Sequence, residues 1–177
     1  YKNYPEKYEE YQCLRPDYMT GIEEVLRLSE KYSKEFDEIR VVDFCSGTGN
    51  ITRQLAEDIK ISEATLIDIN KSFIDIAKNS AINIDRINYL VGNILDVEVT
   101  KKHNINLSVY AYHHVTDGNK NSIVKKIKQS LISGGICVLA EIFLDGKEEN
   151  TEYYENLIED VPHNRNERIS FTDSKER

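Results

Sequence analysis

The residues that could carry chemistry cluster where short apolar runs end. A glycine-rich turn, Cys45-Ser46-Gly47-Thr48-Gly49, directly follows the apolar run Val41–Phe44. Gly47 and Gly49 permit positive φ angles and close approach of a ligand to the backbone, and a helix after the turn would point free amides at that ligand. The spacing fits neither the dinucleotide pattern G-x-G-x-x-G nor a phosphate loop ending in Gly-Lys-Ser/Thr. The turn predicts a site for a charged small molecule, with tight packing as the alternative.

Acidic side chains occur in this run and in the next. Asp43 precedes the turn, and Asp68 closes the run Leu66–Ile69. A carboxylate at the end of the second strand of a nucleotide-binding sheet is well placed to accept hydrogen bonds from ribose hydroxyls. The alternative is an aspartate that only caps a helix. Together with the turn, Asp68 indicates a cofactor that contains adenosine.

Two histidines and a glutamate follow later runs. His113 and His114 come after the run ending at Tyr110, and Glu141 comes near the end of the last run. Because imidazole titrates near neutral pH, either histidine is a candidate general base, and Glu141 is a second candidate. The alternatives are a packed or capping role for the histidines and a surface position for Glu141.

The elements that must position these residues alternate between strand and helix patterns. The spacing predicts strands over 40–44, 64–69, 87–91, 105–110 and 136–143, and helices over 20–35, 50–59, 119–132 and from Asn70 onward. Thr20 and Glu23 have capping-box spacing, and Gly134-Gly135 is expected to end the last helix. This alternation predicts an α/β fold with a doubly wound, mostly parallel sheet and flanking helices.

Composition and charge exclude several classes of protein and of binding partner. With 177 residues, of which 40% are hydrophobic and 31% charged, the chain fits one globular domain. The net charge of −8 disfavours a nucleic-acid partner. Three cysteines without a CxxC pair predict neither a metal site nor a disulfide framework. No apolar run approaches the roughly 20 residues of a membrane span, and no signal core is present, so we expect a cytoplasmic protein.

Five stretches, taken in order, resemble class I S-adenosylmethionine (SAM)-dependent methyltransferases. They are VVDFCSGTGNITRQLAE, LIDINKSFIDIAKNSA, INYLVGNILD, VYAYHHVTD and IKQSLISGGICVLAEIF, and they span about residues 40–143. The resemblance implies this family's fold, SAM as the cofactor and S-adenosylhomocysteine as the product.

The resemblance also implies which residues contact SAM. Those implied at the methionine moiety and the sulfonium are Asp43, Cys45, Ser46, Gly47, Gly49, Tyr110 and Ala111. Those implied at the ribose and adenine are Asp68, Ile69, Asn93 and Ile94. Cys45 stands where the family most often has glycine, and Asn93 replaces the commoner aspartate. The uncharged Asn93 predicts weaker cofactor binding.

The two ends of the chain surround this core of residues 39–143. Residues 1–38 are expected to form a helical lid or cap in which Tyr11 closes over the cofactor by cation–π attraction, and where the segment folds back in this way Arg15 pairs with the cofactor carboxylate. The alternative is an amphipathic segment that only packs on the domain. Residues 144–177 form an acidic segment with at most one poor strand near Ile169–Phe171. Because the family's C-terminal strand hairpin is missing or incomplete, we expect the chain to be a trimmed or incompletely ordered portion of a longer protein.

The segment after the fourth predicted strand indicates the acceptor class. It lacks the Asp/Asn-Pro-Pro-Tyr/Phe pattern of enzymes that methylate base or glutamine amines, and Ala111-Tyr112-His113-His114 is similar to small-molecule methyltransferases. The sequence thus predicts methyl transfer from SAM to a small molecule. A catalytically silent SAM-binding subunit or sensor, an aminopropyl transferase and an NAD-linked oxidoreductase are the alternatives.

Overall fold

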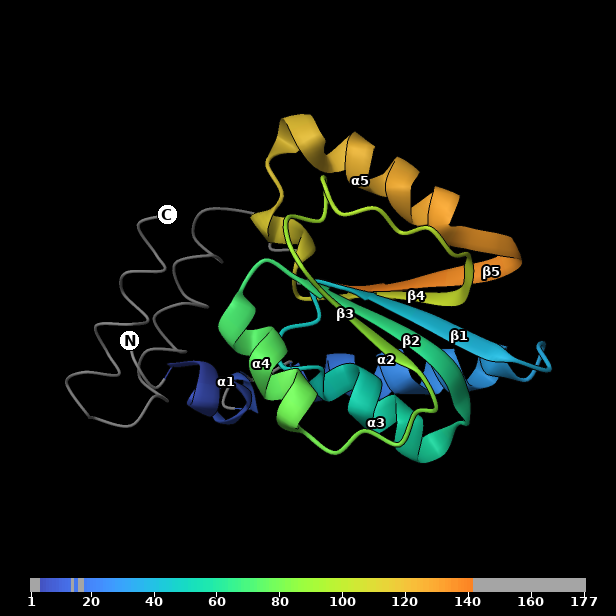
Figure 1. Ribbon diagram of the computed structural model, residues 1–177, viewed down its shortest axis with the longest axis horizontal. Helices are drawn as coiled ribbons and strands as arrows, with labels where there is room; N and C mark the ends of the chain where they lie inside the picture. The colour runs from blue at the N-terminus through green and yellow to red at the C-terminus, as the bar shows by residue number, and fades with distance from the viewer. Residues whose placement is uncertain (1–3, 14, 16–17, 142–177) are drawn as a thin grey trace. The chain divides into compact units, whose positions relative to one another are not determined.

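The computed structural model describes residues 4–13, 15 and 18–141 of the chain (Figure 1). The chain divides into two compact units, one of residues 21–141 and the other of residues 1–20 together with 142–177. In the second unit the described residues form helix α1 (Tyr4–Cys13) and the start of helix α2 (Tyr18–Ser33). The expected strand near Ile169–Phe171 lies outside the described residues. Residues 21–141 form the unit that contains all five strands of the described chain.

Five parallel strands form one sheet in the order β3-β2-β1-β4-β5. The strands are β1 (Ile39–Phe44), β2 (Ile61–Asp68), β3 (Ile87–Val91), β4 (His103–Val109) and β5 (Leu131–Ala140). The chain moves outward from β1 to β3 and then returns to place β4 on the other side of β1. This reversal puts the carboxyl ends of β1 and β4 at the switch point where doubly wound sheets bind ligands. The predicted fold class is confirmed.

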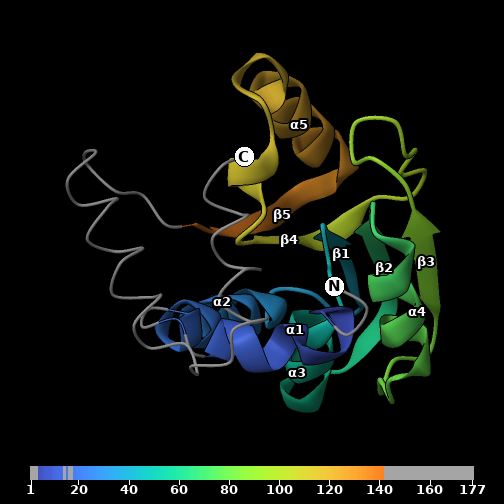
Figure 2. The same cartoon turned by 90° about the vertical axis from the view of Figure 1, so that its left-hand side faces the viewer.

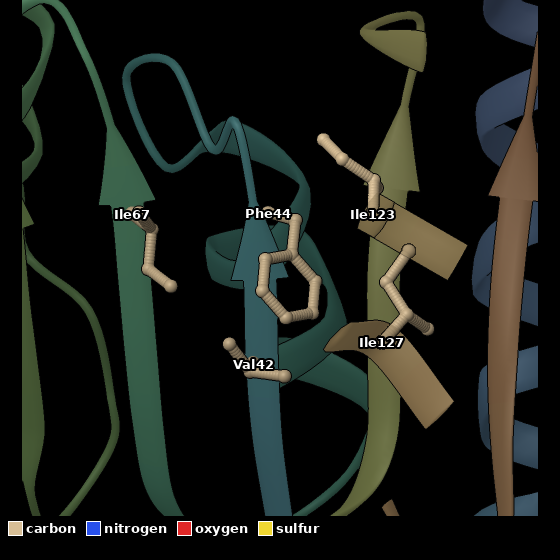
Figure 3. Packing of buried hydrophobic residues seen from close by; sticks show 5 residues of the cluster. All are labelled: Val42, Phe44, Ile67, Ile123 and Ile127. Carbon is tan, nitrogen blue, oxygen red and sulfur yellow. The ribbon is translucent and has the colours of Figure 1, made fainter. Parts of the chain in front are cut away.

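Helices cover both faces of the sheet. Helix α5 (Asp117–Ser130) lies on one face, and α2 and α3 (Asn50–Asp58) lie on the other (Figures 1 and 2). Val42, Phe44 and Ile67 of the sheet pack against Ile123 and Ile127 of α5, and all five are buried (Figure 3). Val42 and Phe44 share this face because side chains alternate along a strand. Asp43, between them, therefore points to the α3 face.

The opposite face holds the glycine-rich turn in place. Leu66 of β2 and Ala77 of helix α4 (Lys71–Asn79) are fully buried there. A Cβ atom on Gly49 would lie 2.8 Å from the Leu66 side chain and 3.3 Å from the Ala77 Cβ.

The predicted cap of α4 is confirmed, because the Asn70 side chain accepts a hydrogen bond from the backbone N–H of Ser72 at 2.9 Å.

Two predicted helix ends are wrong. Helix α2 already begins at Tyr18, so Thr20 lies inside it and forms no capping box with Glu23. Helix α5 ends at Ser130, and Gly134 and Gly135 lie inside β5.

Different interactions explain the end of α5 and the role of these glycines. The buried Asn106 side chain donates to the carbonyl of Ile127 at 2.9 Å and to the hydroxyl of Ser130 at 2.7 Å, which satisfies groups in the last turn of α5. Gly134 has φ +79 in a stretch where the β4–β5 register shifts. The glycine therefore serves an irregularity in the strand rather than a helix cap.

Replacing Gly49 with alanine is expected to lower the free energy of unfolding by about 1–3 kcal/mol, because φ +74 is strained for alanine and the new Cβ crowds Leu66. Gly118→Ala is the matched control, since nothing lies within 4 Å of a Cβ there and the residue is helical. Urea denaturation of the two variants measures the difference. Equal effects of the two substitutions would contradict this account of Gly49.

Candidate functional site

The turn after β1 has an unusual backbone. Cys45, Gly47 and Gly49 have φ values of 61, 55 and 74, all in the left-handed region. The Ser46 N–H donates to the carbonyl of Ile67 at 2.9 Å, which ties the turn to the end of β2. A residue other than glycine costs of the order of 1–2 kcal/mol in this conformation, and such strain is concentrated at functional sites. Cys45 is therefore a strained position that the surrounding contacts maintain.

Asp68 links the turn, β2 and α4. One carboxylate oxygen accepts from the backbone N–H of Gly47 and the other from that of Asn70, each at 2.8 Å. The Asp68 carbonyl accepts from the Gly92 N–H at 2.9 Å, which brings in the segment after β3. Each carboxylate oxygen can accept more than one hydrogen bond. Asp68 can thus organise the turn and still accept from a ribose diol.

Asp43 lies beneath the same turn. It is only 2% exposed, and one of its oxygens accepts from the Thr52 hydroxyl at 2.7 Å. Burial raises the pKa of Asp43 to about 7; the Thr52 hydrogen bond lowers it, and the negative charge of Asp68 raises it. The sequence patterns did not identify Thr52 as the partner of Asp43. The available signal was a hydroxyl residue in the first turn of the helix that follows the glycine-rich turn.

The Cys45 thiol stays protonated in this surrounding. Burial, and then the charges of Asp68 and Asp43, raise the pKa of Cys45 to about 12. A thiol rather than a thiolate is a poor nucleophile and a poor metal ligand. Cys45 therefore contributes its backbone conformation to the turn rather than a reactive group.

The ends of β2 and β3 offer an exposed apolar side chain and an ordered loop. Ile69 is 70% exposed directly after Asp68. The Asn93 side-chain oxygen accepts from the Leu95 N–H at 2.9 Å, so this side chain shapes its own loop. Ile94 packs against the cluster on the α5 face. Contacts of Asn93 and Ile94 with a base remain predictions.

The end of β4 turns sharply. Tyr110 has φ 50, and its N–H donates to the carbonyl of Ala140 at 2.8 Å. Tyr110 and Ala111 are both buried. A Cβ atom on Gly21 would overlap the Tyr110 hydroxyl, so the end of this ring lies against α2. Sequence patterns did not indicate Gly21 as the residue that makes room for Tyr110.

The three catalytic candidates lie beside one another. The His113 Nδ1 is 2.8 Å from one carboxylate oxygen of Glu141, and the other oxygen accepts from the backbone N–H of His113 at 3.1 Å. The rings of His113 and His114 have centroids 3.9 Å apart and are tilted by 50°. The structure thus joins candidates that lie 28 positions apart in the sequence.

The side chain of Tyr11 lies outside the described residues, so its role as a lid remains a prediction. Among the described residues no group of three or more histidine, cysteine, aspartate or glutamate side chains could hold a metal ion. None of the described helices is long and apolar enough to cross a membrane.

Comparisons with known proteins agree with this geometry. A family model described as a methyltransferase domain matches residues 41–135. An uncharacterized methyltransferase of Oceanobacillus iheyensis is 28% identical over 151 residues, which cover 80% of this chain and 68% of that protein. One of Bacillus thuringiensis is 32% identical over 121 residues, 67% of this chain and 53% of that protein. The chain therefore spans between about half and two thirds of the length of these relatives.

Solved structures share the fold. The plantazolicin methyltransferase BpumL in complex with S-adenosylhomocysteine has a TM-score of 0.69 at 14% identity, covering 93% of this chain and 60% of its own. CalS10, an amino pentose methyltransferase of Micromonospora echinaspora bound to SAM, has a TM-score of 0.60 at 14% identity, covering 70% of this chain and 52% of its own. At these identities the likeness concerns the fold.

Replacing Asp43 with asparagine is expected to remove a pH dependence of stability. Because the pKa of Asp43 is raised to about 7, the folded chain holds a proton between about pH 4 and pH 7 that the unfolded chain has released. This contribution to the free energy of unfolding falls as the pH rises through that window. From about pH 5 to 7.5 the fall amounts to about 2–3 kcal/mol, and Asp43→Asn should lose it.

Urea unfolding of both proteins at these two pH values measures the effect. His103, whose pKa is lowered chiefly by burial, changes stability in the opposite direction but is present in both proteins. The comparison therefore isolates Asp43. The same pH dependence in the two proteins would show that Asp43 is ionised throughout.

Proposed function

Because the chain belongs to the methyltransferase domain family and has the class I SAM-dependent methyltransferase fold, we propose that its strand-end site transfers the methyl group of SAM to a small-molecule acceptor. The observation that carries this proposal is the position of Asp68. Its carboxylate holds the left-handed turn of β1 beside the end of β2, at the edge of the sheet where the switch point lies. The relatives are longer than this chain. The activity and the acceptor proposed here are therefore those of the domain that this chain contains.

The residues at this edge fit an adenosyl cofactor. In the described part of the chain the buried Ser46 hydroxyl has no hydrogen-bond partner, so the turn has an unsatisfied polar group of the kind that a ligand's ammonium or carboxylate satisfies. Asp68 retains acceptor capacity for ribose hydroxyls. Ile69, mostly exposed, offers an apolar surface to a base. These features complement the three parts of SAM.

Each residue then has a distinct task. SAM supplies a methyl group on a sulfonium, which is already an activated leaving group. Gly47 and Gly49 let the methionine moiety approach the backbone, and Asp68 holds the ribose. Asp43, beneath the turn, favours a cationic ligand once it is ionised. The protein's contribution is mainly to orient the two reactants, which accounts for a large part of the catalysis of bimolecular transfers.

Two observations favour a small acceptor. The segment after β4 reads Tyr110-Ala111-Tyr112-His113 and lacks the proline pair of enzymes that methylate base or glutamine amines. Proteins of the same fold include an amino pentose methyltransferase and a plantazolicin methyltransferase. An aminopropyl transferase needs acidic residues at this point to bind a polyamine. The segment Tyr110-Ala111-Tyr112 supplies none, which disfavours aminopropyl transfer.

Calorimetric titration with SAM and S-adenosylhomocysteine, with NAD as the control, tests the proposal. We expect both adenosyl compounds to bind and NAD not to bind. A radioactive methyl-transfer screen against hydroxyl, amine and thiol compounds then tests for turnover. Binding without turnover on any acceptor would favour a silent SAM-binding subunit, and NAD binding alone would contradict the proposal.

Asp68→Asn is expected to weaken SAM binding by about 10- to 100-fold, which corresponds to the roughly 1.5–3 kcal/mol of hydrogen bonds to a charged group. Asp75→Asn is the matched control, because Asp75 is a half-exposed aspartate of α4 that pairs with Lys71. Calorimetry gives both dissociation constants, and thermal unfolding shows whether the variants remain folded. A folded Asp68→Asn protein with unchanged affinity would leave Asp68 as a structural residue only.

A further inference from the structure

The contact between His113 and Glu141 joins two strand ends beside the proposed cofactor site. Glu141 accepts from two groups of the same residue, because His113 offers both its ring Nδ1 at 2.8 Å and its backbone N–H at 3.1 Å. A carboxylate that binds the ring and the backbone together fixes the orientation of the ring. This arrangement is more specific than a single surface ion pair.

The sheet itself creates the contact. Val109 of β4 pairs with Ala140 of β5, so Glu141 directly follows the end of the paired segment. The left-handed conformation of Tyr110 turns the chain, and residues Tyr112–His114 form the short helix η1. The turn therefore brings His113 back over the end of β5.

The hydrogen bonds determine where the imidazole carries its proton. An ionised carboxylate can only accept, so the Nδ1 atom facing Glu141 must be the protonated nitrogen. In the neutral ring Nε2 is then free of a proton. The Glu141 side chain is 3% exposed, whereas that of His113 is 44% exposed. The buried carboxylate thus holds a ring that a ligand can reach.

We propose that His113, through Nε2, accepts the proton of the methyl acceptor, and that Glu141 is the residue that positions it. The acceptor is then an oxygen or nitrogen nucleophile that carries a proton. This inference rests on the proposed function. A lone pair of that atom bonds to the methyl carbon, the carbon–sulfur bond breaks toward sulfur, and the proton passes to Nε2. The products are the methylated acceptor, S-adenosylhomocysteine and an imidazolium that Glu141 stabilises.

The geometry also distinguishes the two histidines. Glu141 holds the ring and the backbone of His113, whereas His114 contacts the His113 ring at a centroid distance of 3.9 Å. The inference therefore assigns the proton transfer to His113 and not to His114.

Nitrogen-15 NMR of the histidine rings, at a pH where they are neutral, tests the role of Glu141 without any acceptor. His113 is expected to carry its proton on Nδ1 in the wild type and to populate both tautomers in Glu141→Leu. Glu141→Gln, which keeps the shape and one acceptor, should give an intermediate result and guards against misfolding of the leucine variant. Glu98→Gln, at an exposed carboxylate, is the matched control. An unchanged His113 tautomer in Glu141→Leu overturns the positioning role.

Methyl transfer to catechol, benzylamine and thiophenol tests the proton transfer. His113→Gln is expected to lower kcat on the hydroxyl or amine probe by about 10²- to 10⁴-fold. Its SAM dissociation constant should stay within about twofold, since the ring is not assigned to SAM. Glu141→Gln should also alter the pH profile of kcat.

Three results would overturn the assignment of the proton transfer. They are full turnover of the hydroxyl or amine probe by His113→Gln, an equal loss in His114→Gln, and methylation of the thiol alone. Where no probe is methylated, the NMR comparison still decides the role of Glu141. Failure of wild-type SAM binding would count against the proposed function instead, so the two failures are distinguishable.

Discussion

The hydrogen bond from the Gly47 N–H to the Asp68 carboxylate is the interaction on which the site depends. It joins the turn after β1 to the end of β2, and it forms only because the backbone around Gly47 is left-handed. The same carboxylate receives the Asn70 N–H at the start of α4. One side chain thus sets the position of the turn and of the next helix. A ligand that used Asp68 would contact a group that is already held in place.

Burial explains the electrostatics around this interaction. Asp43 and Asp68 lie at the ends of adjacent strands, and their carboxylates accept hydrogen bonds from different kinds of donor. Asp68 receives two backbone N–H groups, whereas Asp43 receives the Thr52 hydroxyl and has its pKa raised to about 7. A buried carboxylate near neutrality is costly to ionise without a cation. The site is therefore better suited to a cationic ligand such as SAM than to an anionic one.

The second half of the sheet places a different pair at the same edge. Parallel pairing of β4 with β5 brings His113 and Glu141 together, while β1 and β2 carry the aspartates. The order β3-β2-β1-β4-β5 sets these pairs on either side of the switch point. This division matches a reaction in which one group binds the cofactor and another handles the acceptor.

Much of the fold could be predicted from the sequence, because the periodic spacing of apolar residues and the residue types at turns are local properties of the chain. The strand patterns, the glycine-rich turn, the Asn70 cap and the acid at Asp68 all follow from residue types and spacing. The end of α5 does not, because Asn106, from a distant strand, satisfies its last turn while Gly134 serves an irregularity in β5. The partnership of Thr52 with Asp43 and that of Glu141 with His113 likewise depend on which elements the sheet sets side by side. A sequence specifies the donors and acceptors, but only the tertiary structure decides which of them meet, since a hydrogen bond requires its two atoms within about 3 Å.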